Sequence, residues 1–245
     1  ARWLDWSRTA KDIGNQTRSV LSAAGPEPTG STMTATSFDL HARTAHTGGN
    51  GSLMRTAPVA LAFLYDPAGL AEAARKVSAL THYDPRAQQA CQIWCLAIRH
   101  AVLNGELDVR AGLEHLSDEA REFWSERIDE AETLPVRSFR PNGYVVSALQ
   151  AAWAAIAQTP VPTDRFECEH LTDALAAAVR IGDDTDTVAA IAGALLGARW
   201  GMSAVPAEWR RILHGYPGIT GHRLEELAVL AARGGGTAKY GWPKV

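Results

Sequence analysis

The sequence predicts an all-α fold, a compact helical bundle in which residues 1–245 form a single domain. Apolar residues recur at helical spacing over most of the 245 residues. No run alternates between apolar and polar residues at the period of two that a half-buried strand shows. The apolar positions are spread evenly, so no point divides the chain into two cores, and no repeat of about 20 to 50 residues is visible.

The first helices are expected within residues 1–24. Apolar residues fall into two short pieces, and Asp12 is expected to cap the second piece, which Gly25 and a proline then end. Residues 25–51 are rich in Thr, Ser, Gly and His and show neither helical nor strand spacing. We therefore expect a long loop, and loops of more than about 12–15 residues in compact domains are usually functional or disordered.

Two helices in the middle of the chain are marked by an Asp followed directly by a Pro. Asp66 and Asp84 are each suited to cap a helix whose first residue is the following proline. The pattern predicts helices at about 67–80 and 85–104, and Gly105 is expected to close the second one.

Helical segments also fill the rest of the chain. They are expected as two charged surface segments within 108–132, then at 144–158, 166–181, 188–201, from Pro206 onward and at 221–233. Within 188–201, Gly193, Gly197 and Gly201 recur every fourth residue, which favours the close approach of a neighbouring helix. The Gly-rich stretch 234–245 is expected to be a mobile tail or to dock on a partner.

Composition excludes several classes of protein. A net charge of −3 argues against bulk electrostatic binding to nucleic acid or to an anionic membrane. No segment reaches the roughly 18 apolar residues of a membrane span, and the first residues do not form a signal peptide. Cys91 and Cys95 share a helix face and are expected to be buried thiols, since three cysteines make no disulfide framework. We expect a soluble, cytoplasmic protein.

An acidic stretch precedes the helix at 188–201. Three carboxylates and two hydroxyls occupy the five positions from Asp183 to Thr187. Two carboxylates about 6 Å apart repel by roughly 3 kcal/mol at an effective dielectric constant of about 20. A helix N-terminus offsets part of this, and Mg²⁺ or Ca²⁺ offsets more, because these ions take carboxylate and hydroxyl oxygens. The alternative is a plain helix start in which Asp186 or Thr187 is the capping residue.

A glycine-rich stretch, Gly48-Gly-Asn-Gly-Ser-Leu-Met-Arg55, leads directly into a predicted helix. Glycines let a backbone approach a ligand closely, and the free N–H groups of a helix start bind phosphate. In isolation the pattern favours a simple turn, because it is neither a Walker loop nor a GxGxxG motif preceded by a strand.

These stretches together resemble motifs of the ADP-ribosylglycohydrolase family, which includes dinitrogenase reductase-activating glycohydrolase. The longest and most specific match is Gly182-Asp-Asp-Thr-Asp-Thr187 with the small-residue helix that follows as far as Gly201. Gly49-Asn-Gly-x-x-Met-Arg55 resembles a second family motif, and Thr81-His-x-x-Pro85 resembles a third. The resemblance implies the all-α fold of this family.

The resemblance also implies a metal centre. Its ligands would be Asp184, Asp186 and Thr187, binding Mg²⁺ or Mn²⁺ as part of a site that holds two ions in the complete family domain. Asp184 and Asp186 would thereby act in catalysis. Asp183 stands where the family usually has Gly.

The substrate implied by the resemblance is ADP-ribose or an ADP-ribosylated molecule. The substrate-binding residues would be Gly49, Asn50, Gly51, Ser52, Met54, His82, Gly143 and Tyr144. The glycine-rich residues would hold the diphosphate and ribose, and His82 would contact the substrate without being the general base. Tyr144 would stack on adenine, with a core tyrosine as the alternative. We expect Arg55 to pair with a structural carboxylate in preference to phosphate.

The implied activity is Mg²⁺-dependent hydrolysis of the glycosidic bond between ADP-ribose and an acceptor. Family members also carry a Thr-Asp-Asp-Thr motif near their N-terminus, and no such motif occurs in this sequence. We therefore expect a family domain without its N-terminal segment, and three explanations stay open: the segment is a separate piece, it is missing from the recorded sequence, or the chain is a degenerate family member. In the first case a companion segment would supply the remaining ligands. The alternative function is a module that binds ADP-ribose or another nucleotide without catalysis.

Overall fold

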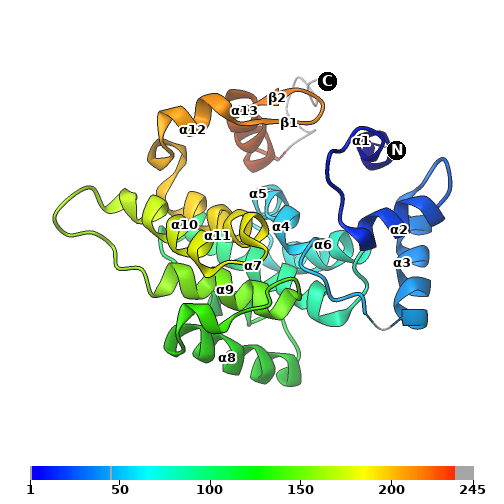
Figure 1. Ribbon diagram of the computed structural model, residues 1–245, viewed down its shortest axis with the longest axis horizontal. Coiled ribbons are helices and arrows are strands. Elements are labelled where there is room, and N and C mark those ends of the chain that lie inside the picture. The colour runs from blue at the N-terminus through cyan, green and yellow to red at the C-terminus, as the bar shows by residue number, and fades with distance from the viewer. Residues whose placement is uncertain (1, 45, 235–245) are drawn as a thin grey trace.

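The computed structural model describes residues 2–44 and 46–234, and these residues form an all-α fold, as predicted (Figure 1). The central helix is α7 (Pro85–Asn104), which packs against α6 (Pro67–Ala79), α9 (Val145–Ala157) and α11 (Thr185–Trp200). Trp94 of α7 is buried, and its Nε1 donates a hydrogen bond of 2.9 Å to the carbonyl oxygen of Ile191 in α11. Burial of these faces forms the main hydrophobic core.

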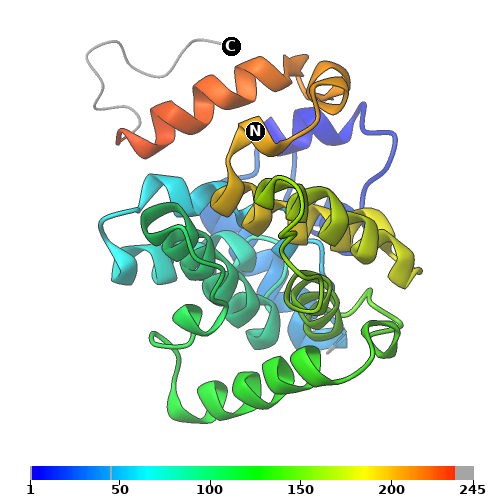
Figure 2. The ribbon, with the colours of Figure 1, turned by 90° about the vertical axis from the view of Figure 1, so that its left-hand side faces the viewer.

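Further layers cover the central helices. The helix α10 (His170–Ile181) packs on α9 and α11, and α8 (Asp118–Thr133) packs on the outer side of α9. Figure 2 shows α8 on one side of the central helices, and α12 (Ala207–Ile212) and α13 (Gly221–Ala232) on the opposite side. Among the described helices, none is both long and apolar enough to cross a membrane.

The sequence predictions for α6 and α7 are confirmed. The side chain of Asp66 accepts a hydrogen bond from the Gly69 backbone, and that of Asp84 accepts one from Arg86. Gly105 closes α7 with a φ of +69°, which glycine adopts without steric cost. Cys91 and Cys95 are both buried free thiols, as expected.

The prediction of a long loop at residues 25–51 is wrong, because α3 (Gly30–Thr44) occupies most of it. The buried face of α3 carries Met33 and Ser37, which are one turn apart. Thr hydroxyls of α3 donate to carbonyls one turn back, as Thr34 does to Gly30 at 3.0 Å, whereas the buried Ser37 hydroxyl has no partner among the described residues. Ser and Thr outnumber the apolar residues of α3, and this polar composition hid the helical spacing.

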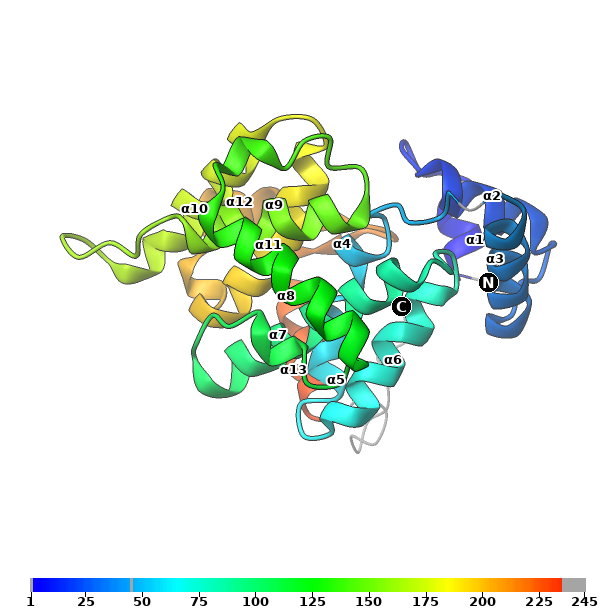
Figure 3. The same cartoon turned by 90° about the horizontal axis from the view of Figure 1, so that it is seen from below.

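The N-terminal helices form a second, smaller hydrophobic cluster. It contains α1 (Arg2–Ser7), α2 (Asn15–Ala23) and α3, and its buried residues are Ile13, Val20, Leu21 and Met33. Figures 1 and 3 both place these helices at one end of the molecule. The predicted cap at Asp12 is wrong, because Gly14 precedes the first residue of α2 and no side chain caps it.

The helix predicted after the glycine-rich stretch is split into α4 (Leu53–Thr56) and α5 (Pro58–Ala62). Pro58 has no N–H to continue the hydrogen bonds of α4. The first of the two charged segments predicted within 108–132 is only a short 3-10 turn, η1 (Arg110–Gly112). Gly112 lies directly against the backbone of α7, where an added Cβ would come within 2.4 Å of the Ile93 carbonyl oxygen.

The remaining elements are short. They are η2 (Val136–Ser138), η3 (Glu167–Glu169), η4 (Met202–Ala204), β1 (His214–Gly215) and β2 (Ile219–Thr220). The two strands pair antiparallel in a hairpin that the sequence pattern did not predict, with His214 opposite Thr220. Of the predicted tail 234–245, residues 235–245 lie outside the described residues.

The predicted close packing on the glycines of α11 is wrong. An added Cβ would meet Leu175 at an ordinary 3.5 Å on Gly193 and would meet nothing within 4 Å on Gly197. Gly201 instead ends the helix with a φ of +76°. The glycines of α11 line an apolar groove of about 630 Å³ between this helix and α13.

Candidate functional site

Two asparagines join the glycine-rich stretch to the acidic stretch. The Nδ2 of Asn50 donates to the carbonyl oxygen of Asn142 at 2.9 Å and to Oδ2 of Asp184 at 2.7 Å. Asn142 is fully buried; its Nδ2 donates to the Gly182 carbonyl at 3.1 Å and its Oδ1 accepts from the Asp184 backbone at 2.9 Å. Three segments far apart in the sequence therefore meet at one point, which we call the asparagine junction (Asn50, Asn142 and Asp184).

Backbone pairing reinforces this junction. Gly49 and Tyr144 form an isolated antiparallel bridge. The Asn50 backbone donates to the Gly143 carbonyl at 3.1 Å, and Val145 donates to the Gly48 carbonyl at 2.9 Å. The start of α9 is thereby attached to the glycine-rich stretch.

The acidic stretch forms a turn before α11. Asp183 has a φ of +68°, a left-handed conformation that Asp tolerates better than most non-glycine residues. Its Oδ2 accepts a hydrogen bond of 2.8 Å from the Asn142 backbone. Asp184 is the residue that precedes the helix, and no side chain caps α11. The alternative in which Asp186 or Thr187 is the capping residue is therefore wrong.

The side-chain oxygens of the acidic turn are largely free of protein partners. Asp186 is exposed, and no other described side chain bonds to its carboxylate. The buried Thr187 hydroxyl makes only a weak hydrogen bond of 3.7 Å to the sulfur of Met54. Oδ2 of Asp184 accepts a hydrogen bond from the Asn50 side chain. The hard oxygen donors of Asp184, Asp186 and Thr187 fit Mg²⁺ or Mn²⁺ in chemical type. Within residues 2–44 and 46–234, no three His, Cys, Asp or Glu residues gather as a metal site, so this turn offers an incomplete ligand set.

A cavity of about 730 Å³ lies on the other side of the glycine-rich stretch. Its lining includes six of the predicted substrate-binding residues, namely Gly49, Asn50, Gly51, Met54, His82 and Gly143. The opposite walls come from α1, from residues 12–17 and from Tyr216 of the C-terminal hairpin. The structure thus brings most of the predicted substrate residues to one cavity, with Asn50 linking it to the acidic turn.

Two predicted substrate residues lie elsewhere. Ser52 is fully buried, and its hydroxyl accepts hydrogen bonds from Ser78 at 2.9 Å and from Cys91 at 3.6 Å, so its side chain faces the core. Tyr144 is 48% exposed, lies over Gly48 and is not among the residues that line the cavity. Burial and the neighbouring Asp84 carboxylate raise the pKa of Tyr144.

Arg55 extends along the cavity wall. Its Nη1 donates to the Gly51 carbonyl at 2.9 Å, and its guanidinium lies 4.7 Å from the ring centre of Trp3. Burial lowers the pKa of Arg55 to about 10, and its Nε is buried without a partner. The carboxylate partner predicted for Arg55 is not found among the described residues, because none of their ion pairs includes it. An uncompensated positive charge therefore faces the cavity.

His82 lies beside this charge at the inner end of the cavity. Its Nδ1 is 2.7 Å from the Thr81 hydroxyl, and Arg55 Nη2 donates to that hydroxyl at 2.5 Å. Burial, with a smaller effect of Arg55, lowers the pKa of His82 to about 3. His82 is therefore neutral near pH 7, and so low a pKa makes its imidazole a weak base.

Sequence reasoning missed several residues of this site. Asn142 lies in Pro141-Asn142-Gly143, and this common turn signal gave no indication of a role in the site. Gln16 holds the cavity wall together, since its Nε2 donates to the carbonyls of Thr47 at 2.9 Å and Thr81 at 2.8 Å. Trp3 and Trp6 belong to the first apolar piece within residues 1–24, a pattern that predicts a helix and not a place in the cavity wall.

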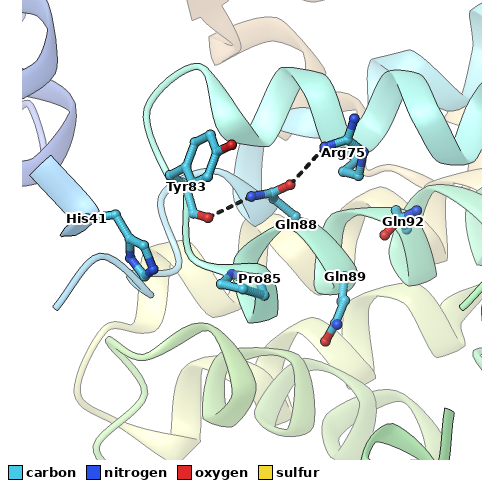
Figure 4. A pocket seen from close by; sticks show the side chains of 7 residues that line it. All are labelled: His41, Arg75, Tyr83, Pro85, Gln88, Gln89 and Gln92. Atoms are coloured by element: carbon cyan, nitrogen blue, oxygen red, sulfur yellow. Dashed lines mark hydrogen bonds between the residues drawn. The ribbon is translucent and has the colours of Figure 1, made fainter. Parts of the chain in front are cut away.

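A second cavity lies between α3 and the first turns of α7 (Figure 4). Its volume is about 250 Å³, and it is lined by His41, Arg75, Tyr83, Pro85, Gln88, Gln89 and Gln92. Arg75 is already paired with Glu72 at 2.7 Å, and Gln88 donates to the Tyr83 carbonyl at 2.6 Å. This cavity contains none of the predicted site residues.

Comparison with known proteins connects this site to a family. The family model described as ADP-ribosylglycohydrolase matches residues 1–239. The ADP-ribosylarginine hydrolase Tri1 of Pseudomonas putida (strain GB-1) is 30% identical over 201 residues, covering 81% of this chain and 48% of that protein. The ADP-ribosyl-[dinitrogen reductase] glycohydrolase of Rhodospirillum rubrum is 29% identical over 162 residues, covering 66% of this chain and 49% of that protein.

Further similarity comes from an animal enzyme and from a solved structure. The ADP-ribosylhydrolase ARH3 of Bos taurus is 30% identical over 214 residues, covering 75% of this chain and 56% of that protein. A structure titled ADP-ribosylglycohydrolase-related protein complex aligns with a TM-score of 0.62 at 27% identity, covering 95% of this chain and 72% of that one. The chain thus spans about half the length of the curated relatives it matches.

Proposed function

The chain belongs to the ADP-ribosylglycohydrolase family, and on this premise we propose that it carries the substrate cavity and part of the metal site of a Mg²⁺-dependent hydrolase. The reaction is cleavage of the glycosidic bond between ADP-ribose and an acceptor. The observation that carries the proposal is the asparagine junction, because Asn50 both lines the cavity and donates to Asp184 of the acidic turn. A ligand in the cavity would then contact Asn50, whose side chain reaches the Asp184 carboxylate.

The chemistry of the cavity suits an ADP-ribose unit. A volume of about 730 Å³ lies within the range of roughly 300–1,000 Å³ that is typical of small-molecule sites. The unpaired guanidinium of Arg55 favours an anion such as a diphosphate. Gly49 and Gly51 allow close approach to the backbone, and the rings of Trp3 and Trp6 offer apolar faces to a base or ribose.

The acidic turn supplies the groups for the reaction. Asp184, Asp186 and Thr187 would hold Mg²⁺, and the chemistry this ion supplies when bound is polarisation of substrate oxygens and activation of a water. The Asn50 side chain donates to the Asp184 carboxylate and the Asn142 side chain accepts from the Asp184 backbone, so the two asparagines fix the position of Asp184. Asp186 is the carboxylate best placed to accept a proton, since it is exposed and other described side chains leave it free.

Calorimetric titration of Mg²⁺ into the 245-residue chain tests the metal part of the proposal. We expect binding of one ion, because three side-chain ligands leave several positions to water. The double variant Asp184→Ala plus Asp186→Ala should lose this binding, whereas Asp164→Ala, in an exposed loop without side-chain partners among the described residues, should keep it. Unchanged binding in the double variant would remove Asp184 and Asp186 from the site.

The second candidate function is a module that binds ADP-ribose without turnover. The incomplete ligand set of the described residues favours it for this chain alone. A hydrolysis assay with ADP-ribosylarginine, run beside an ADP-ribose binding measurement, separates the two. Binding without turnover supports the module, and turnover that requires Mg²⁺ and Asp186 supports the hydrolase.

A further inference from the structure

The inner wall of the cavity holds a chain of hydrogen bonds that runs from Arg55 through Thr81 to His82. From it we infer that Thr81 is a positioning residue that holds His82 as the Nε2–H tautomer, so that His82 donates a hydrogen bond to an acceptor oxygen of the ligand. The inference deepens the proposed function and rests on it for the identity of the ligand. It assigns a role to Thr81 and a direction to the hydrogen bond of His82.

The direction follows from counting protons at the Thr81 hydroxyl. A guanidinium can only donate, so Oγ1 of Thr81 accepts from Arg55 Nη2 over 2.5 Å. The same oxygen lies 2.7 Å from Nδ1 of His82, and it has no other hydrogen-bond partner within the described part of the chain. Thr81 is fully buried, so its single proton has no water to bond to.

Two arrangements of the protons are then possible, and one of them is costly. If Nδ1 carried the proton and donated to Thr81, the hydroxyl proton would be buried without an acceptor. An unsatisfied buried donor of this kind costs about 1–3 kcal/mol. If Nδ1 is unprotonated, it accepts the hydroxyl proton, and both Oγ1 of Thr81 and Nδ1 of His82 are satisfied. The imidazole proton of neutral His82 is then on Nε2.

The protonated nitrogen faces the cavity. A Cβ added to Gly51 would lie 3.2 Å from Nε2, and one added to Gly49 would lie 3.5 Å from it, so the two glycines leave this atom open. No described residue accepts a hydrogen bond from Nε2, and His82 lines the cavity. A ligand that fills the cavity therefore meets an N–H donor at this point.

The neighbouring charge supports a neutral ring. Arg55 is the charged group that shares the hydroxyl of Thr81, and together with burial it keeps the pKa of His82 far below 7. A neutral Nε2–H imidazole donates from its cavity side and cannot take a proton there. The complementary ligand atom is an oxygen with a free lone pair, which ADP-ribose offers as a phosphate, a ribose ether or a hydroxyl oxygen.

The tautomer can be read directly by nuclear magnetic resonance. Two-bond ¹⁵N–¹H correlations of histidine-labelled protein distinguish the Nε2–H form, the Nδ1–H form and the imidazolium. We expect the ligand-free 245-residue chain at pH 7 to show His82 as the neutral Nε2–H form, with the signal assigned by its loss in His82→Gln. Observation of the Nδ1–H form or of the imidazolium would overturn the inference.

A pair of substitutions tests the role of Thr81. Thr81→Val keeps the size of the side chain but removes the hydroxyl, so His82 should become a mixture of tautomers and the affinity for ADP-ribose should fall about tenfold. Thr81→Ser keeps the hydroxyl and should retain both the single tautomer and the affinity. A Val variant with the parent's tautomer and affinity would show that Thr81 does not position His82.

The outcomes separate this inference from the proposed function. If the parent chain binds no ADP-ribose, the proposed function fails, and the tautomer of the ligand-free chain still decides the assignment of Thr81. If the parent binds ADP-ribose but His82 is not the Nε2–H form, the inference fails alone. If Thr81→Val does not fold, the spectrum of the parent remains the deciding measurement.

Discussion

Removal of the Asn142 side chain should damage both the stability of the fold and the acidic turn. Asn142→Ala deletes the hydrogen bond from Nδ2 to the Gly182 carbonyl and the one that Oδ1 accepts from the Asp184 backbone. The contacts made by the Asn142 backbone, to Asp183 and from Asn50, do not involve the side chain and remain possible. The variant therefore removes only the two side-chain hydrogen bonds that Asn142 makes to the acidic turn.

The expected loss is about 2–3 kcal/mol. Each of the two hydrogen bonds contributes roughly 0.5–1.5 kcal/mol net, and a donor left unsatisfied adds about 1–3 kcal/mol. Together these contributions span about 2–6 kcal/mol. Because Gly182 and Asp184 are partly exposed, water can replace some of the lost bonding, and the expected loss lies near the lower end of this span. With a urea dependence of about 3 kcal/mol per M, the midpoint of unfolding should fall by roughly 1 M.

Urea unfolding followed by circular dichroism measures this change, and Asn104→Ala is the matched control. Asn104 is an exposed residue in the last turn of α7, and its side chain bonds only to His100 among the described residues. Mg²⁺ affinity should fall in Asn142→Ala together with the midpoint, because Asp184 loses its fixed position. The reasoning fails if Asn142→Ala unfolds at the same urea concentration as Asn104→Ala and binds Mg²⁺ as the parent does.

Two further predictions concern the packing of a glycine and the ionisation of the buried histidine. Gly112→Ala should destabilise the fold by about 1–3 kcal/mol, because its Cβ would overlap the Ile93 backbone. Gly197→Ala has free space for its Cβ and should stabilise α11 by roughly 0.5–1 kcal/mol. Equal thermal unfolding midpoints for the two variants would contradict this prediction. The pKa of His82 is lowered from about 6.5 to about 3, so the unfolded chain binds the extra proton first and folding stability is lost as the pH falls below about 6.5. Between pH 6.5 and 5 the parent should lose about 2 kcal/mol more than His82→Gln, and identical pH dependence of their unfolding midpoints would refute the assignment.

Features of this structure that depend on neighbouring residues can be predicted from the sequence, whereas features that depend on distant contacts cannot. The Asp-Pro starts of α6 and α7 are local, since a capping carboxylate and a proline determine a helix start on their own. The helix at Gly30–Thr44 was missed because polar Thr and Ser residues interrupt the apolar spacing of Met33 and Leu40. Several of its Thr hydroxyls bond to carbonyls within the helix.

The site shows the same division between local and long-range information. The motifs around Gly49 and Asp184 could be recognised one at a time, but their junction depends on Asn142, which lies 92 positions from Asn50 and 42 from Asp184. No periodicity or composition records such a contact. The aromatic wall from Trp3 and Trp6 depends likewise on how α1 folds back over the cavity.

Asp183 connects the departure from the family pattern to the geometry of the turn. The resemblance places Gly at this position, and the φ of +68° explains why, since glycine adopts the left-handed region without steric cost. Asp tolerates the same region better than most residues, and here its carboxylate gains a hydrogen bond from the Asn142 backbone. That bond directs the extra negative charge toward Asn142, where an N–H compensates part of it. The additional carboxylate therefore helps to hold the turn, while the oxygens of Asp186 and Thr187 remain available to a cation.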